Sequence, residues 1–336
     1  MGQECITLST ADARNLIQDA LAGSGLLRKY VVYFTDAILD TELSGLEGHG
    51  FYWLQYYCAH LRSGKVDGNV VPQLEAVSES SFRIDAGHGF AHPAIEEGFK
   101  VLIPAAKAHG ISAMSVHNSY NAGTLGFHTG FLARAGLLGL GATNAVPNLA
   151  PVGGKIPIIG TNPFSYAVPA PNGKIAFLVD QSATQVAWTA VKRAADAGKN
   201  IPLGWALDAD GKPTKNAQAG LDGSMAPSGG IKGFNMGLFV EVLCSALAGG
   251  KLGPEQGSFT DDDGKAISNG QFFIAIDPNT FSKGTFDQTI KKLVTSIIGQ
   301  EGSRLPNSRR ELNKTKLTES GLKLEMEIYK TLKGFT

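Results

Sequence analysis

The sequence has little that points to nucleic acid, membranes or disulfide cross-links. It has 30 Lys and Arg and 30 Asp and Glu, so its net charge is 0 and no bulk field attracts nucleic acid or an anionic membrane. Its three cysteines are far apart, which argues against a disulfide framework and predicts a reducing cytoplasm. No apolar run approaches the ~18 residues of a transmembrane helix, and no leader-like segment begins the chain. We therefore expect a cytoplasmic globular protein with no nucleic-acid or membrane partner.

Several motifs of catalysis and phosphate binding are also absent. The sequence has no G-x-S-x-G nucleophile elbow and no G-x-x-x-x-G-K-[ST] phosphate loop. The nearest string to the dinucleotide fingerprint G-x-G-x-x-G is GLGATN, from Gly139, which lacks the third Gly and leads to Pro147 rather than into a helix. These absences argue against nucleophilic hydrolysis and against a Rossmann domain.

The histidines do not predict a metal site. His88 and His92 have the i, i+4 spacing of a metal pair, but Gly87, Gly89 and Pro93 argue against a helix there. No Glu stands between them as in the H-E-x-x-H motif. We expect no metal.

What the sequence does contain is a long core-forming chain that is rich in glycine. Its 336 residues are 43% hydrophobic, enough for two or three lobes. Its 42 glycines exceed the usual share of about 7% and imply many tight turns. Helical periodicity is expected over residues 10–23, 27–38, 51–64, 94–109, 125–136, 184–197, 232–249 and much of the last fifty. Strands are expected over 111–116, 137–143, 164–168, 174–180 and 271–277, and a strand with a turn over 201–214. Since strict β-α-β alternation is missing, a doubly wound parallel sheet is not expected.

The segment from residue 143 to 163, TNAVPNLAPVGGKIPIIGTNP, combines four Pro and three Gly between apolar runs. Pro fixes φ and Gly permits positive φ, so such a segment follows one shaped path instead of forming a regular element. Long shaped loops in packed proteins are often functional. The closing GTNP offers a hydroxyl, a carboxamide and backbone N–H groups to a polar or anionic ligand. The alternative is an ordinary surface loop.

His49 is the histidine most suited to chemistry. Gly48 and Gly50 flank it, and the aromatic residues from Phe51 to Trp53 follow. An imidazole with a pKa near ~6.5 exchanges a proton easily at neutral pH, and the glycines allow a substrate to approach. From the residues alone, a general acid–base and a buried, hydrogen-bonded histidine are both open.

Two basic features could bind phosphate or carboxylate. Lys232, in GGIKG at an expected helix start, could neutralise a phosphate there or could simply be solvated. Arg304, Arg309 and Arg310 surround Pro306 and form either an anion-binding turn or a charged surface loop.

A set of segments along the chain belongs together: GHGF at His49, PNLAPVGGKIPIIGTNP, LVDQSAT at Asp180, AGKNIPLGWALDADGKPT, PSGGIKG at Lys232, GQFFIAIDP and SRLPNSRR. These segments resemble the type-2 malate/L-lactate dehydrogenases, which are NAD(P)-dependent oxidoreductases without a Rossmann fold. They occur in the family's order across nearly the whole chain.

The resemblance implies an α/β fold with a central mixed, largely antiparallel sheet and helical segments at both ends. Residues 1–75 would carry the catalytic histidine, 76–296 would bind NAD or NADP, and 297–336 would pack against the first segment. It also implies a homodimer and a small carboxylic acid as substrate. The reaction would pass a hydride between nicotinamide and a 2-oxo or 2-hydroxy acid, or alternatively reduce a cyclic imino acid. A third reading is a non-catalytic relative that binds a metabolite.

The resemblance also assigns roles to residues. His49 matches the family's proton donor. Cofactor contacts would fall on Tyr120, Asn121, Ala122, Gly123, Thr124, Asp180, Gln181, Ser182, Lys232, Arg304, Asn307 and Arg309, and substrate contacts on Thr161, Gly48 and Trp53.

Four positions depart from the family pattern. Gly48 replaces the usual Ser or Thr beside the catalytic histidine, and Tyr120 replaces a His. Trp53 stands where many members have an Arg that binds the substrate carboxylate, a bidentate role that Trp cannot take. Ala190 stands where imine reductases have Asp. We therefore expect a substrate pocket that differs from that of a standard malate or lactate enzyme, with Trp53 as an apolar wall.

Overall fold

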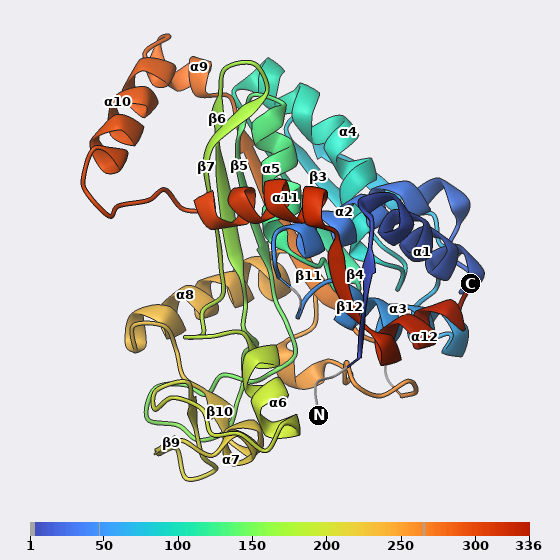
Figure 1. The fold of residues 1–336 in the computed structure, drawn as a ribbon. Coiled ribbons are helices and arrows are strands. Elements are labelled where there is room, and N and C mark those ends of the chain that lie inside the picture. Colours follow the sequence, from blue (N-terminus) through green and yellow to red (C-terminus); the bar gives the residue numbers. More distant parts are fainter. Residues whose placement is uncertain (1–3, 47, 265) are drawn as a thin grey trace.

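A large mixed sheet forms the centre of the protein (Figure 1). The computed structural model describes residues 4–46, 48–264 and 266–336. Within these residues seven strands pair in the order β2, β3, β4, β11, β5, β6, β7, and only β3 and β4 run parallel. The strands are β2 (Gln73–Ser78), β3 (Ser81–Asp85), β4 (Ile111–Ser119), β5 (Leu138–Thr143), β6 (Phe164–Ala170), β7 (Lys174–Gln181) and β11 (Asn269–Ile276).

Helices cover both faces of this sheet because successive strand residues point in opposite directions. Gly141 of β5 faces Thr129 of α5 (Leu125–Arg134). Its neighbour Ala142 packs in a cluster with Val240, at the end of α8 (Ile231–Glu241), and with the π-helical turn η1 (Val242–Leu247). The long helix α4 (Ala91–His109) shares the core on the α5 side. The sheet is therefore the middle layer of three.

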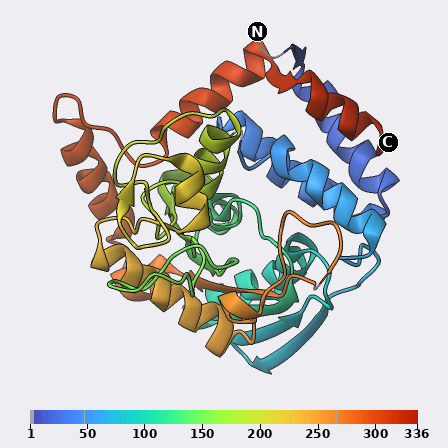
Figure 2. The same cartoon turned by 90° about the horizontal axis from the view of Figure 1, so that it is seen from below.

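The two ends of the chain fold together into a helical lobe. Strand β1 (Cys5–Leu8) pairs antiparallel with β12 (Leu322–Glu325). Figure 2 shows the first and last helices gathered along one edge of the molecule, where α12 contacts both α1 and α3. The helices of this lobe are α1 (Thr10–Gly23), α2 (Arg28–Leu43), α3 (Phe51–Ser63), α11 (Ser308–Ser320) and α12 (Met326–Lys333).

A smaller unit hangs below the sheet in Figure 1. It has a core of its own, which includes Val191, Ala206 and Met225. Its elements are α6 (Trp188–Asp196), β8 (Ala206–Leu207), β9 (Pro213–Thr214), α7 (Ala217–Asp222) and β10 (Ser224–Met225). The loop 143–163 joins this core through Leu149 and Ile159, which form a β-bridge.

An exposed arm leaves the sheet after β11. It consists of α9 (Pro278–Ser282) and α10 (Phe286–Ile298), neither of which has a buried residue. The arm projects at the upper left of Figure 1. Phe281 is 65% exposed although it is a large apolar residue.

The expected fold class is confirmed, whereas several local expectations are corrected. The mixed, largely antiparallel sheet with helical termini is present. The sequence does not predict strands β1, β2, β3, β10 and β12, and the helix expected from residue 184 begins at Trp188. The helix expected over 232–249 is α-helical only to Glu241 and then π-helical. The division of the chain into segments at residues 75 and 296 stays a prediction. Strand β2 (Gln73–Ser78) runs across the first of these boundaries. In the described part of the chain, no helix combines the length and the apolarity that crossing a membrane requires.

The core of the helical lobe yields a stability prediction. Leu21 of α1 is completely buried, whereas Leu312 of α11 is 72% exposed. We expect Leu21→Ala to lower the free energy of unfolding by about 2–5 kcal/mol, because it loses buried apolar area and leaves a cavity. Leu312→Ala is the matched control and should change it by about 0.5 kcal/mol or less. Urea unfolding at one protein concentration measures both, and equal effects would contradict this account of the lobe.

Candidate active site

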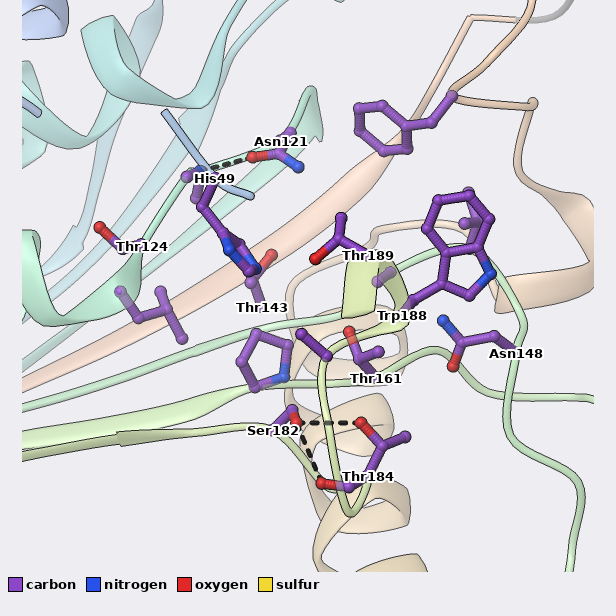
Figure 3. A pocket seen from close by; sticks show the side chains of 18 of the residues that line it. His49, Asn121, Thr124, Thr143, Asn148, Thr161, Ser182, Thr184, Trp188 and Thr189 are labelled. Atoms are coloured by element: carbon purple, nitrogen blue, oxygen red, sulfur yellow. Dashed lines mark hydrogen bonds between the residues drawn. The ribbon is translucent and has the colours of Figure 1, made fainter. Parts of the chain in front are cut away.

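One deep pocket lies where the helical lobe, the sheet and the smaller unit meet. Its volume is about 950 Å³, at the upper end of the range for ligand sites. In Figure 3, His49 and Asn121 enter from one side, Trp188 and Thr189 from the other, and Ser182 and Thr184 from below. Both ends of the loop 143–163 also line it, through residues 143–148 and through Thr161 and Pro163.

His49 sits on the pocket wall in a turn between α2 and α3, where its N–H donates to the Leu46 carbonyl at 2.8 Å. Burial lowers the pKa of His49 below its ordinary value, because a charged ring loses hydration there. The Asp180 carboxylate opposes this shift and the Arg310 guanidinium adds to it. The neutral ring therefore predominates at pH 7 and can accept a proton.

Asp180 and Arg310 form an ion pair at the pocket. The Arg310 guanidinium donates to the Asp180 carboxylate at 2.8 Å, and the Asp180 side chain is only 9% exposed. A second contact joins Arg310 to the Asp180 backbone carbonyl at 3.3 Å. Because Arg310 lies on α11 and Asp180 on β7, the pair connects the end of the chain to the sheet.

The turn from Asn121 to Thr124 forms another wall. The Asn121 carboxamide oxygen accepts from the Gly123 N–H at 2.5 Å and from the Tyr57 hydroxyl at 3.2 Å. The Thr124 hydroxyl contacts that of Thr41 on α2 at 2.9 Å. The side chains of the turn are thus fixed by the first segment before any ligand binds.

The wall below the pocket is stabilised by hydroxyl groups. The Ser182 hydroxyl lies 3.0 Å from that of Thr184 (Figure 3). The Thr184 hydroxyl also donates to the Val186 carbonyl at 2.8 Å. The Ala183 N–H donates to the Thr161 carbonyl at 2.8 Å. These local bonds compete with a helix, which explains why α6 begins only at Trp188.

The loop 256–260 forms a further part of the pocket wall. The buried Lys65 ammonium donates to the Ser258 carbonyl at 2.7 Å and to the Asp261 carbonyl. Phe259 packs edge-on against Trp53, with ring centroids 5.6 Å apart. Trp53 and Phe259 therefore form an apolar part of the wall.

The structure brings together most residues that the sequence proposes for the site. Pocket-lining residues among them are His49, Trp53, Asn121, Ala122, Gly123, Thr124, Thr161, Asp180, Gln181, Ser182 and Arg309. Their roles toward cofactor or substrate stay predictions.

Five proposed residues do not line the pocket. Gly48, next to His49 in the chain, packs against Thr189. Tyr120 is buried, and its hydroxyl bonds to His60. Lys232 and Arg304 are exposed. Asn307 precedes α11 with a positive φ of 71° and donates to Glu311 at 3.0 Å.

The carboxamide of the GTNP segment, that of Asn162, does not face the pocket as the sequence analysis expects. The sequence offers it to a ligand, but Asn162 is completely buried and donates to the Glu241 carboxylate at 2.7 Å and the Gly237 carbonyl at 2.9 Å. Its oxygen accepts from the Ala145 N–H at 3.1 Å. Asn162 therefore shapes the loop, and Thr161 beside it reaches the pocket.

Sequence reasoning misses several lining residues, among them Leu46, Gln185, Val186, Trp188, Thr189, residues 256–260 and Asn269. Their segments bear no motif and approach the pocket only through tertiary packing. The aromatic residue at 188 and the Gly-Ser-Phe run at 257–259 are the only local signals.

The sequence argues against a helix at His88 and His92, and this expectation holds for His88 but not for His92. His92 belongs to the first turn of α4, where Pro93 is tolerated because N–H groups there lack helical partners. His88 precedes the helix with a positive φ of 64°. His92 stacks on Phe34 at 3.9 Å between centroids. Within the described residues, no three His, Cys, Asp or Glu side chains are grouped as metal ligands.

Comparison with known proteins gives one consistent result. The profile of the malate/L-lactate dehydrogenase family matches residues 8–333. A (2R)-3-sulfolactate dehydrogenase (NADP(+)) from Chromohalobacter salexigens is 38% identical over 93% of each chain. A Delta(1)-pyrroline-2-carboxylate reductase from Ancylobacter novellus is 32% identical over 98% of each chain. The crystal structure of the delta1-piperideine-2-carboxylate reductase from Pseudomonas syringae pvar. tomato superposes with a TM-score of 0.91 at 28% identity, over 98% of this chain and 100% of that one.

The two charges near His49 yield opposite predictions. We expect Asp180→Asn to lower the pKa of His49, because the carboxylate favours the charged ring, and Arg310→Met to raise it, because the guanidinium disfavours that form. Titration of the His49 ring by NMR measures both. Lys314→Met, one turn further along α11 and paired with Asp40, is the control and should leave the pKa unchanged. Shifts of the same sign in both site variants would contradict this electrostatic account.

Proposed function

Because the chain belongs to the malate/L-lactate dehydrogenase family, we propose that His49 exchanges a proton with a 2-oxo or 2-hydroxy acid in the pocket. The protein is an NAD(P)-dependent oxidoreductase, in line with its relatives' names. The observation that carries the proposal is the position of His49. Its half-buried ring lines a large pocket and feels the opposing charges of Asp180 and Arg310, which form an ion pair at the same pocket.

The pocket fits a nicotinamide dinucleotide together with a small acid. Apart from its volume of about 950 Å³, it contains two buried carboxamide oxygens, those of Asn148 and Asn269, that accept no hydrogen bond from the described residues. Donor groups of a ligand would satisfy them. Asn121 to Thr124, Gln181, Ser182 and Arg309 would hold the cofactor, which when bound supplies or accepts the hydride.

The chain's own part in the reaction is proton transfer. In reduction, negative charge develops on the substrate's carbonyl oxygen, and a protonated His49 would donate to it. In oxidation, the neutral ring would take the hydroxyl proton. Because the pKa of His49 lies below its ordinary value, we expect reduction to become faster as the pH falls toward that pKa. Trp53, Phe259 and Leu46 give the same pocket apolar surface, which would help to exclude water from the reaction.

The substrate is proposed to be a small carboxylic acid that contacts Thr161 and Trp53, with Gly48 leaving room for the Thr189 side chain next to the histidine. Trp53 presents an indole where many family members have an Arg, so the anionic end of the acid would bind elsewhere. Arg309 lines the pocket and is the cation we propose for an anionic group of either cofactor or substrate.

Reduction of a cyclic imino acid is the alternative, because relatives of that name are 32% and 28% identical to the chain. Ala190 on α6 does not line the pocket, but it stands where the imine reductases of the family have an Asp, and this difference favours the 2-oxo acid. Loss of the absorbance of reduced nicotinamide, with 2-oxo acids on one side and pyrroline- and piperideine-2-carboxylate on the other, separates the two. Tight cofactor binding without turnover of either class would favour a metabolite-binding relative.

We also propose a homodimer in the cytoplasm. Large apolar side chains are exposed on α8 and η1, where Phe239 is 52% and Leu247 is 61% exposed, and on the α9–α10 arm. Apolar surface of this extent commonly marks a protein–protein interface. The buried cysteines Cys58 and Cys244 keep free thiols, as in reducing compartments.

Replacement of His49 tests its proposed role in proton transfer. We expect His49→Ala to lower kcat by about 10²–10⁴, because general acid–base catalysis contributes that factor, while the dissociation constant of the cofactor changes less than about threefold. Steady-state kinetics and fluorescence titration measure the two quantities. His109→Ala, at the half-exposed end of α4, is the control and should retain full activity. Turnover of His49→Ala within a few-fold of the wild type would rule out the proposed role.

Replacement of Trp53 tests its proposed contact with the substrate. Trp53→Arg introduces a guanidinium that binds a carboxylate bidentately, so we expect kcat/KM for small 2-oxo acids such as pyruvate to rise about tenfold or more. Trp53→Phe keeps an apolar wall and should not show this gain. Absence of a gain on every small 2-oxo acid tested would contradict the assignment of Trp53 to the substrate side.

A further inference from the structure

The two glycines that flank His49 are each packed tightly against a polar side chain. A Cβ atom added to Gly48 would lie 2.9 Å from the Thr189 hydroxyl oxygen. A Cβ atom added to Gly50 would overlap the carboxylate of Glu42. Each glycine next to His49 therefore makes room for one particular polar side chain, Thr189 on one side and Glu42 on the other.

Glu42 reaches this turn from the last full turn of α2. Its side chain is buried, with a relative exposure of 4%. One carboxylate oxygen accepts the N–H of Phe51, the first residue of α3, at 2.5 Å. Since Gly50, which precedes α3, has no side chain that could cap the helix, Glu42 provides the cap from another helix.

A carboxylate is well suited to this position. The first turn of α3 presents the positive end of the helix dipole, which stabilises a negative charge, and the Phe51 N–H there has no partner within the helix. The 13 residues of α3 make that dipole substantial. A buried carboxylate without such donors would be costly, so the position of Glu42 and the start of α3 depend on each other.

We propose that Glu42 is the positioning residue for His49: by binding the first N–H of α3 against Gly50, it fixes where the imidazole enters the pocket. This inference rests on the proposed role of His49 as proton donor. Glu42 is absent from the residues that line the pocket, so it acts through the turn and not through contact with the substrate.

Three variants test the proposal. Glu42→Leu removes the acceptor, and Gly50→Ala keeps the carboxylate but displaces it. In both we expect kcat to fall by about 10²-fold, because a displacement of the catalytic group by about 1 Å costs that much, while the dissociation constant of the nicotinamide cofactor stays within about threefold. Glu42→Gln keeps an oxygen that can accept from Phe51, and should retain kcat within about fivefold.

A second readout does not depend on activity. The NMR signal of the His49 ring in the cofactor-free protein should move in Glu42→Leu and Gly50→Ala and stay in place in Glu42→Gln. Asp40→Leu is the matched control, because Asp40 is a carboxylate on the same helix that pairs with Lys314 at 2.7 Å. It should change neither kcat nor the ring signal.

The outcomes are distinguishable. If Glu42→Leu does not fold, Gly50→Ala decides alone. Wild-type kcat and an unmoved ring signal in a folded Gly50→Ala protein would overturn the proposal. If His49→Ala retains turnover, the proposed function fails even when Glu42→Leu moves the ring signal. If His49→Ala is inactive and the Glu42 and Gly50 variants match the wild type, only the positioning role fails.

Discussion

The buried carboxylate of Glu241 is the interaction on which the shape of the pocket depends. It accepts from the Asn162 carboxamide at 2.7 Å and from the Ser245 hydroxyl at 2.9 Å, and it receives longer contacts from the Asn144 carboxamide and the Gly253 N–H at 3.4 and 3.1 Å. Asn144 and Asn162 stand near the two ends of the loop 143–163, so one charge at the end of α8 anchors both. A buried carboxylate with several donors is stable, and removal of its partners is costly. The loop can therefore present Thr161 at a fixed place.

The second constraint is that the pocket belongs to no single part of the chain. His49 comes from the helical lobe, Asp180 from the sheet, Thr189 from the smaller unit and Arg310 from the last fifty residues. The ion pair of Asp180 with Arg310 and the pairing of β1 with β12 hold these parts together. This explains how a protein without a dinucleotide fingerprint can form a cofactor-sized pocket: the ligand-binding surface is assembled from loops, a strand and helices where three cores meet.

The sequence predicts the features that depend on local pattern and fails where tertiary contacts decide. The helices of residues 10–23 and 51–63 follow from their apolar spacing and their Ser9 and Gly64 caps. Strand β2 is exposed at every position, so it lacks the alternation of buried and exposed residues by which a strand is predicted. The family strings locate most pocket residues, but composition cannot tell that the carboxamide of Asn162 turns inward or that Lys232 faces solvent. Those outcomes depend on Glu241 and on the direction of α8, which only the fold determines.

The most direct test is a crystal structure of the protein with the oxidised nicotinamide cofactor and an unreactive carboxylic acid that mimics the substrate. The account predicts that the nicotinamide ring lies in the pocket. It also predicts that a ring nitrogen of His49 lies within about 3 Å of the oxygen that stands for the substrate's carbonyl. A cofactor bound elsewhere, or a substrate oxygen that faces another donor while His49 points away, would contradict it.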